Sequence, residues 1–385
     1  MDHSAQVKKY FQLRTKDHNG IMKDIMYTSE KEHSIIVCDN DYLNLVHHKD
    51  VVTKQANDLL DSSVARDTIK SSIFISEFDP HTALEKDIAA WYGKDCYLAQ
   101  SGYAANVGVM HAICTPGMNV YIDRFLHASF YDGLAARKVK VHVFLPNNAA
   151  DLEKKIQENG PGLILIESVY STSGSFAPLE EIVTIKKKHN CLIVVDESHS
   201  LGLYGSEGRG LLYDKGLVSD VEYVTASLAK AFATRAGIVF TNHTTYAKEN
   251  AFPFIFSSGL VQNDIVRIRA IWEVIKPADD RRARLMRISA FLREELSKFR
   301  GIQVVNSESA PCPIIGVFVG GDEETLVRFH RFLSKKGILA APFIAPATSK
   351  KFPVLRFSLH CDITIEQGAA IVRAFKDWRF FGCKL

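Results

Sequence analysis

Between residues 119 and 241 the chain repeats one pattern, in which a short, mostly apolar run ends in a polar residue and a helix-like stretch follows. Runs this apolar are typical of strands that are covered on both faces. Their alternation with helices predicts an α/β fold with a mainly parallel sheet. Ligands bind at the carboxyl ends of the strands in such sheets, so the polar residues there are site candidates. The runs span residues 119–123, 139–144, 162–167, 191–196, 221–225 and 236–241, and the polar residues at strand ends are Asp123, Glu167, Asp196 and Thr225.

The pattern of residues along the chain changes near Pro277, which predicts a second domain. A charged helical stretch at 279–299 is followed by three further strand-like runs and two further helical stretches. The 385 residues are therefore expected to form an N-terminal arm (1–45), a large α/β domain (46–275) and a smaller C-terminal α+β domain (276–385). The later strand-like runs lie at 302–305, 313–319 and 354–359, and the later helical stretches at 323–336 and 365–378.

Composition narrows the classes of function. A net charge of only +3 disfavours a dedicated nucleic-acid binder. No run approaches the roughly 18 apolar residues of a membrane span, and the first ten residues are too polar for a signal peptide. Seven scattered cysteines without a C-x-x-C pair predict a cytoplasmic protein without a disulfide framework or structural zinc, and the absence of an H-E-x-x-H motif disfavours other metal sites.

Two residues carry the chemistry. Lys230 closes the segment Ser227-Leu228-Ala229-Lys230 and is flanked by apolar residues, which is unusual for a surface lysine. A Ser-x-x-Lys segment also occurs in penicillin-recognising enzymes, but Asp196 ends the apolar run at 191–196 and distinguishes the two readings. Pyridoxal phosphate (PLP) needs an amine for a Schiff base and a carboxylate for its ring nitrogen. The pair therefore predicts a PLP enzyme that makes or breaks bonds at the α-carbon of an amino acid, although a strand-end Asp is elsewhere often a cap or turn residue.

Further residues fit a cofactor of this kind. The small-residue turn Ser101-Gly102-Tyr103 opens a helix and can present free backbone N–H groups to a phosphate, and Ser227 can contribute a hydroxyl. The flat imidazole of His127, just past a strand, can stack on the cofactor ring.

Three more positions complete the candidate site. His199, three residues after Asp196, can reach the ring hydroxyl, and Ser171 can hydrogen-bond the cofactor. Arg356 lies inside a strand-like run, where a charge needs a partner. That partner is either a bound substrate carboxylate or an internal salt bridge.

Together these segments resemble the α-oxoamine synthase family, which are PLP enzymes of fold type I. The resemblance extends from Asn40-Asp41-Tyr42-Leu43 to Arg356 and includes 101–106, 127–129, 171–174, 177–179 and 196–202. It implies that Lys230 is the Schiff-base lysine and that the family's homodimer shares its active sites. The other implied roles are Asp196 at the ring nitrogen, His199 and Ser171 at the ring hydroxyl, His127 on the ring, Gly102, Tyr103 and Ser227 at the phosphate, Ser257 and Ser258 at the partner subunit's phosphate, Arg356 at the substrate carboxylate and Asn40 near the substrate.

Departures from the family pattern point to one branch. Residues 76–80 replace a glycine-rich segment, Ala229 replaces the glycine before the lysine, and residues 346–350, which include Ser349 as a substrate-binding candidate, are also distinctive. These features resemble the quorum-sensing synthases of long-chain α-hydroxyketone autoinducers. That branch implies an acyl-coenzyme A and a small amino acid, or S-adenosylmethionine, as substrates of a decarboxylating Claisen condensation. The alternatives are 8-amino-7-oxononanoate synthase, glycine C-acetyltransferase, an aminotransferase or decarboxylase, and a PLP-binding regulator without turnover.

Overall fold

The computed structural model describes residues 33–46, 69–306, 310–345 and 347–380, together with positions 4, 53–54 and 56–58. The chain forms two compact units. One unit, called the large unit here, combines Asn40–Ser171 with Ser175–Arg284. The other, the small unit, combines the described residues up to Asp39 with Thr172–Gly174 and the residues from Leu285 onward. The domain boundaries expected after residues 45 and 275 stay predictions.

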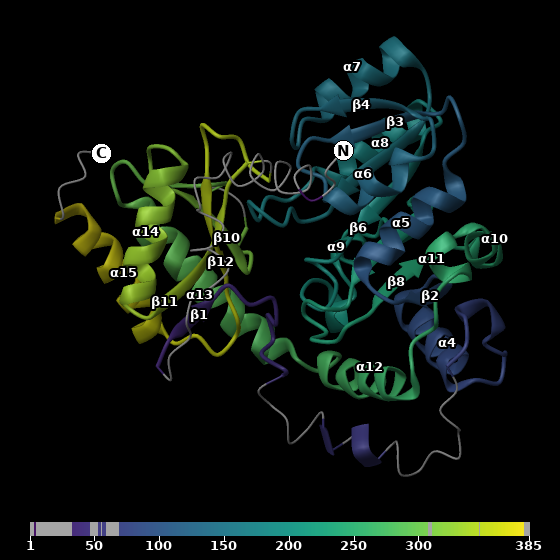
Figure 1. Cartoon of the computed structure of the whole chain (residues 1–385), viewed down its shortest axis with the longest axis horizontal. Helices are drawn as coiled ribbons and strands as arrows, with labels where there is room; N and C mark the ends of the chain where they lie inside the picture. Colours follow the sequence, from purple (N-terminus) through teal and green to yellow (C-terminus); the bar gives the residue numbers. More distant parts are fainter. Residues whose placement is uncertain are drawn as a thin grey trace. The chain divides into compact units, whose positions relative to one another are not determined.

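The large unit is built on a seven-stranded sheet with the order β2-β8-β7-β6-β5-β3-β4 (Figure 1). The pairs β3/β4, β3/β5, β5/β6 and β6/β7 are parallel, which confirms the predicted mainly parallel α/β fold. β8 runs antiparallel to both of its neighbours. The strands are β2 (Cys96–Ala99), β3 (Asn119–Asp123), β4 (Lys140–Phe144), β5 (Leu163–Glu167), β6 (Leu192–Asp196), β7 (Tyr223–Ser227) and β8 (Gly237–Phe240).

Helices cover this sheet, and side-chain caps set the N-termini of several of them. Asp79, Ser101 and Asn148 each accept a hydrogen bond from a backbone N–H in the first turn of the helix that follows. The apolar face of α5 packs with α6 against the sheet and contributes Val109 and Met110 to the buried core. The α-helices of the large unit are α4 (Pro80–Tyr92), α5 (Gly102–Ile113), α6 (Ala128–Ala135), α7 (Ala149–Asn159), α8 (Leu179–Lys188), α9 (Leu211–Asp214), α10 (Thr244–Asn250), α11 (Phe252–Ile255) and α12 (Gln262–Ile275).

The small unit holds a five-stranded sheet with the order β1-β11-β12-β10-β9. β1 pairs in parallel with β11, and the other pairs are antiparallel. Helix α14 packs on β11 and β12 and contacts α15, and α13 begins in the large unit and continues into the small one. The elements are β1 (Ile35–Val37), α13 (Asp279–Ser297), β9 (Gln303–Val304), β10 (Ile314–Phe318), α14 (Glu323–Lys335), β11 (Ile338–Phe343), β12 (Val354–Ser358) and α15 (Ile365–Phe380). None of the helices in the described part of the chain is long and apolar enough to cross a membrane.

Candidate active site

Asp196 is fixed at the carboxyl end of β6, in register with Glu167 on β5 and Thr225 on β7. Its side chain is 5% exposed. The backbone N–H of Ser198 donates to Oδ1 at 2.8 Å, and the Nδ2 amide of Asn106 donates to Oδ2 at 2.8 Å. Hydrogen bonds to both oxygens fix the direction of a carboxylate. Asp196 is therefore a buried carboxylate whose orientation is set by protein groups.

The neighbouring strand carries a second buried carboxyl group, Glu167. Burial and the adjacent Asp196 raise the pKa of Glu167 well above its usual range. The backbone N–H of Ser171 donates to its Oε2 at 3.2 Å. Burial and the adjacent carboxylate therefore both disfavour a second negative charge beside Asp196.

The segment that carries Lys230 lies in the connection between β7 and β8. Lys230 is half-buried, and its carbonyl accepts the backbone N–H of Ala233 at 2.8 Å. The backbone N–H of Ser227, the last residue of β7, donates to Ser198 Oγ at 2.8 Å. This bond ties the segment leading to the lysine to the turn that follows Asp196.

The turn that opens α5 lies close to Ser227. A Cβ atom at Gly102 would lie 2.5 Å from Ser227 Cβ, so only glycine fits this approach. Ser101 caps the helix by accepting the N–H of Ala104 at 3.0 Å. The side chain of Tyr103 is exposed, and its hydroxyl donates to Asp132 at 2.9 Å. The N-terminus of α5 and Ser227, both predicted to bind the cofactor phosphate, therefore lie close together.

PLP fits the polar groups present in this region. The buried Thr225 Oγ1 has no hydrogen-bond partner within the described chain, which is expected where a bound group supplies one. Asp196 offers the carboxylate for a protonated ring nitrogen, and Lys230 follows Thr225 by five residues on the same segment. The donor set, the helix N-terminus and the amine are those that PLP needs.

A chain of hydrogen bonds connects His127 to Asp196. His127 caps α6, and its Nδ1 lies 2.8 Å from Ser129 Oγ. Ser129 Oγ accepts the Nδ2 amide of Asn106 at 3.0 Å, and the same amide donates to Asp196. Ser129 and Asn106 are buried, whereas His127 is exposed. His127, predicted to lie on the cofactor ring, and Asp196, predicted to lie at the ring nitrogen, are thus linked through two residues to which the sequence assigned no role.

His199 lies in the turn after Asp196 and is 5% exposed. Its Nδ1 is 2.7 Å from the hydroxyl of Tyr42, a residue of the segment that also contains Asn40. The predicted substrate-side residue Asn40 and the predicted ring-side residue His199 are therefore both next to Tyr42.

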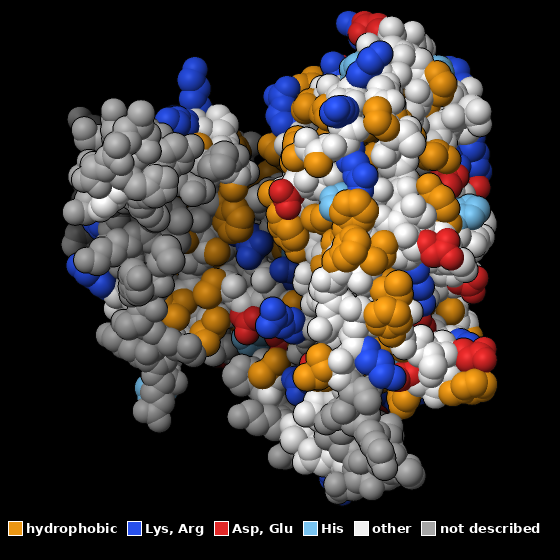
Figure 2. Space-filling view, turned by 45° about the vertical axis from the view of Figure 1, so that its right-hand side comes forward, with side chains coloured by type: hydrophobic (Ala, Val, Ile, Leu, Met, Phe, Trp, Pro, Cys, Tyr) orange, Lys and Arg blue, Asp and Glu red, His pale blue; other side chains and the backbone are white. Residues whose placement is uncertain are grey.

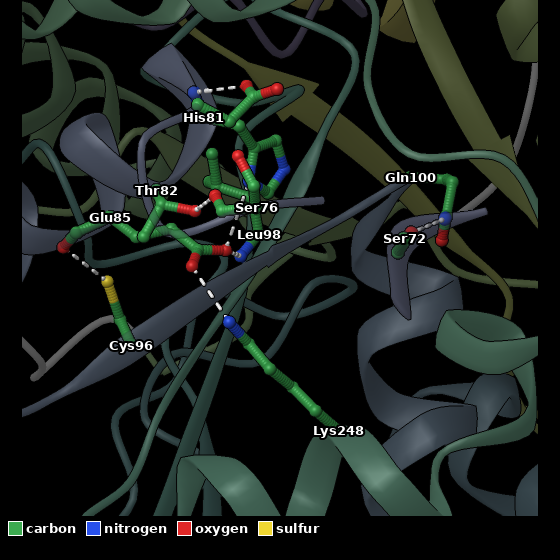
Figure 3. Close-up of polar contacts among 10 residues, drawn as sticks. Ser72, Ser76, His81, Thr82, Glu85, Cys96, Leu98, Gln100 and Lys248 are labelled. Atoms are coloured by element: carbon green, nitrogen blue, oxygen red, sulfur yellow. Dashed lines mark hydrogen bonds and ion pairs between the residues drawn. The ribbon is translucent and has the colours of Figure 1, made fainter. Parts of the chain in front are cut away.

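Ser257 and Ser258 lie beside Ser71 and Ser72. The Ser72 N–H donates to the Ser257 carbonyl at 3.3 Å. Gln100, next to the turn that opens α5, donates through Nε2 to the Ser258 carbonyl at 2.7 Å. The same Nε2 donates to Ser72 Oγ at 3.2 Å (Figure 3). Gln100 therefore connects the turn at Ser101 with the Ser257–Ser258 segment.

A cluster of polar residues surrounds Glu85 of α4 (Figure 3). Glu85 Oε1 accepts the Leu98 N–H at 2.7 Å, and Oε2 accepts Lys248 Nζ at 2.9 Å. His81 Nδ1 lies 3.5 Å from Glu85, and burial lowers the pKa of His81. The cluster borders a cavity of about 480 Å³ that is also lined by Ser72. The hydrogen bonds of Glu85 therefore hold α4 to β2 and α10.

The remaining predicted residues belong to the small unit. Arg356 lies on β12, is 8% exposed, and places its guanidinium 4.6 Å from the centre of the Phe343 ring. Ser349 Oγ accepts the Lys351 N–H at 3.3 Å. Their roles at the substrate stay predictions.

The fold and this arrangement define a PLP-dependent enzyme of fold type I, as the sequence predicted. Residues 32–375 match the family of class I and class II aminotransferases, and the chain belongs to that family. The chain is 37% identical over 334 residues to the CAI-1 autoinducer synthase of Vibrio campbellii, covering 86% of this chain and 83% of that protein. It is 30% identical over 312 residues to the 8-amino-7-oxononanoate synthase of Lysinibacillus sphaericus, covering 80% and 79%.

Solved structures have the same fold. The serine palmitoyltransferase of Sphingomonas wittichii has a TM-score of 0.82 at 27% identity, covering 89% of this chain and 86% of that one. A PLP-bound serine palmitoyltransferase from S. paucimobilis has a TM-score of 0.86 at 23% identity, covering 96% and 97%. This chain is therefore an α-oxoamine synthase-like, PLP-dependent acyltransferase. The predicted family and cofactor are confirmed.

Proposed function

We propose that this chain transfers the acyl group of a medium- or long-chain acyl-coenzyme A to the α-carbon of a small amino acid, or of S-adenosylmethionine. Free coenzyme A and carbon dioxide leave, and the product is a long-chain α-aminoketone that precedes an α-hydroxyketone autoinducer. The 37% identity with an autoinducer synthase across 86% of the chain carries this proposal. The departures at residues 76–80 and 346–350 support it, because they resemble the same branch.

PLP, when bound, supplies an electron sink for negative charge that develops at the α-carbon of the amino acid. We propose that Lys230 holds the cofactor through its amine and then moves the α-proton through Nζ. Asp196 keeps a proton on the ring nitrogen, because its carboxylate is buried and held in one direction by Asn106 and Ser198. His199 and Ser171 are assigned to the ring hydroxyl.

The remaining residues are assigned to the cofactor phosphate, to the face of the cofactor ring and to the substrates. Ser101, Gly102, Tyr103, Thr225 and Ser227 are proposed to hold the phosphate side of the cofactor within one subunit. His127 is assigned to the ring face, where it can also polarise the thioester carbonyl. Substrate binding is assigned to Asn40, Ser349 and Arg356, with the Arg356 guanidinium on the amino-acid carboxylate, and Ser257 and Ser258 are assigned to the partner subunit's phosphate.

The homodimer is part of the proposal. Several large apolar side chains of the large unit are exposed, including Phe78 at 88% and Phe256 at 76%. Figure 2 shows hydrophobic side chains clustered on an exposed face of the protein. Apolar patches of this kind mark association surfaces. The cytoplasmic location stays a prediction from the cysteine pattern.

An assay across both substrates tests the proposal. PLP-loaded protein is mixed with acyl-coenzyme A of increasing chain length and with a panel that includes aminobutyrate, glycine, alanine, serine and S-adenosylmethionine. Free thiol is followed spectroscopically, and products are identified by mass spectrometry. We expect long-chain aminoketones, and no thiol release from Lys230→Ala. The acyl series also includes a seven-carbon acyl-coenzyme A that ends in a carboxyl group. If this substrate and alanine give 8-amino-7-oxononanoate as the only product, the alternative that the 30% identical relative represents is favoured.

A further inference from the structure

The contact between Tyr42 and His199 is short and fully enclosed. The two atoms, Tyr42 Oη and His199 Nδ1, are 2.7 Å apart, the tyrosine is 0% exposed and the histidine 5%. The ring centres are 6.0 Å apart and tilted by 54°, so the hydroxyl meets the imidazole at its edge. An enclosed hydrogen bond at one ring nitrogen decides which nitrogen of a neutral histidine carries the proton.

The segment that presents Tyr42 is held in place independently of His199. The Asp41 carboxylate accepts the N–H groups of Leu45 at 2.9 Å and Val46 at 2.7 Å. Arg281 donates to the Leu43 carbonyl at 2.9 Å. These bonds hold the backbone of residues 41–46 in a turn, and the Tyr42 ring that it carries is fully buried.

The histidine side of the contact is equally constrained. The Ser198 N–H is bound by Asp196, and Ser200 Oγ lies 2.9 Å from Glu197 Oε1 and 2.8 Å from Ser168 Oγ. His199 lies between these two anchored residues. The Tyr42–His199 bond therefore joins two rigid segments.

We propose that Tyr42 is a positioning residue whose hydroxyl donates to Nδ1 of His199, so that the imidazole proton lies on Nε2. The distances support this direction: Nδ1 is at 2.7 Å, whereas Asn40 Oδ1 is at 3.5 Å from the same hydroxyl. A hydroxyl has one hydrogen, and it goes to the nearer acceptor. Nε2 is then an oriented donor, and its use toward the ring hydroxyl of the cofactor rests on the role of His199 in the proposed function.

The tautomer can be read in the cofactor-free protein. Histidines are labelled with ¹⁵N, and the ring signals of His199 are identified by their loss in His199→Gln. At about pH 8, where an ordinary imidazole is neutral, we expect the wild type to show a protonated Nε2 and an unprotonated, hydrogen-bonded Nδ1. In Tyr42→Phe the Nδ1 signal should shift and the two tautomers should mix. The matched control is Tyr121→Phe, which removes the hydroxyl of an equally buried tyrosine that donates to the Gly160 carbonyl.

A protonated Nδ1 in the wild type would overturn the proposal without any variant. So would His199 signals that are the same in Tyr42→Phe and in the wild type. In the PLP-loaded enzyme, the visible absorbance of Tyr42→Phe should change, and PLP affinity should fall about fivefold, as expected for one buried hydrogen bond. Failure of the acyl transfer assay with the expected tautomer in place would reject the proposed function and leave the Tyr42 assignment standing.

Discussion

Glu197 gives a pH dependence of stability that can be worked out from the structure. The residue is 0% exposed, and burial raises its pKa from 4.5 to about 7. Between these two values the folded chain holds a proton that the unfolded chain has released. The free energy of unfolding therefore falls as pH rises through this range. One pKa unit corresponds to about 1.4 kcal/mol, so the loss amounts to about 3 kcal/mol by neutral pH and above.

The substitution Glu197→Gln removes this titration and can keep the hydrogen bonds with Leu212, Ser200 and Tyr92. Leu212 N–H and Ser200 Oγ donate to Glu197 Oε1 at 3.0 and 2.9 Å, and an amide oxygen can accept both. Tyr92 donates to Oε2 at 3.1 Å, and its hydroxyl can turn to accept from an amide nitrogen. We expect the variant to gain about 3 kcal/mol relative to the wild type between about pH 4.5 and pH 8.

Urea unfolding of both proteins across this pH range, at one protein concentration, measures the difference directly. Other buried carboxyl groups titrate in both proteins and cancel. The control is Glu180→Gln, an exposed carboxylate whose pKa is lowered by its hydrogen bond to Lys215, so its titration lies below the range tested. A difference between Glu197→Gln and the wild type that stays constant with pH would refute the reasoning.

Three further changes test the site. Gly102→Ala would place a Cβ 2.5 Å from Ser227 Cβ, and we expect PLP affinity, measured by absorbance titration, to fall at least about tenfold. Asn106→Ala removes the amide that donates to Asp196, and urea unfolding of the apo-protein should report a loss of about 2–4 kcal/mol. Glu85→Ala leaves a buried N–H and an ammonium without their acceptor, and a loss of about 2–3 kcal/mol is expected in the same assay. An unchanged PLP affinity would contradict the first prediction, and an unchanged free energy of unfolding would contradict the second or the third.

The strands that carry the site were predictable because each is a continuous apolar run. The predicted strand at 119–123 coincides with β3, and the predicted strand at 191–196 differs from β6 by one residue at its start. β8 was predicted as a strand, but its antiparallel direction was not. The connection from β7 to β8 is too short for the crossover that a parallel pair requires. β1 has only three residues, and its partner β11 lies some three hundred residues later, so no local pattern reveals either pairing.

The residues of the candidate site also fall into two groups, those that the sequence could reveal and those that it could not. Asp196 and Lys230 were visible because a carboxylate after a strand and a lysine among apolar residues are locally unusual. Asn106, Ser129 and Tyr42 were not, because an amide, a hydroxyl and a phenol are unremarkable until the fold brings them within hydrogen-bond distance of a charged or titratable group. Helical spacing alone places Asn106 four residues after Gly102, on the face of α5 that approaches β7.

These unassigned residues determine what the recognisable ones can do. Asp196 has a single direction because Asn106 and Ser198 occupy its two oxygens, and His199 has a single direction if Tyr42 occupies its Nδ1. Both constraints come from protein atoms alone, so the carboxylate and the imidazole are oriented before any cofactor binds. A site organised in this way loses little further freedom on binding, which favours affinity. Substitutions at these supporting positions should therefore weaken cofactor binding while every residue that the sequence identified is still in place.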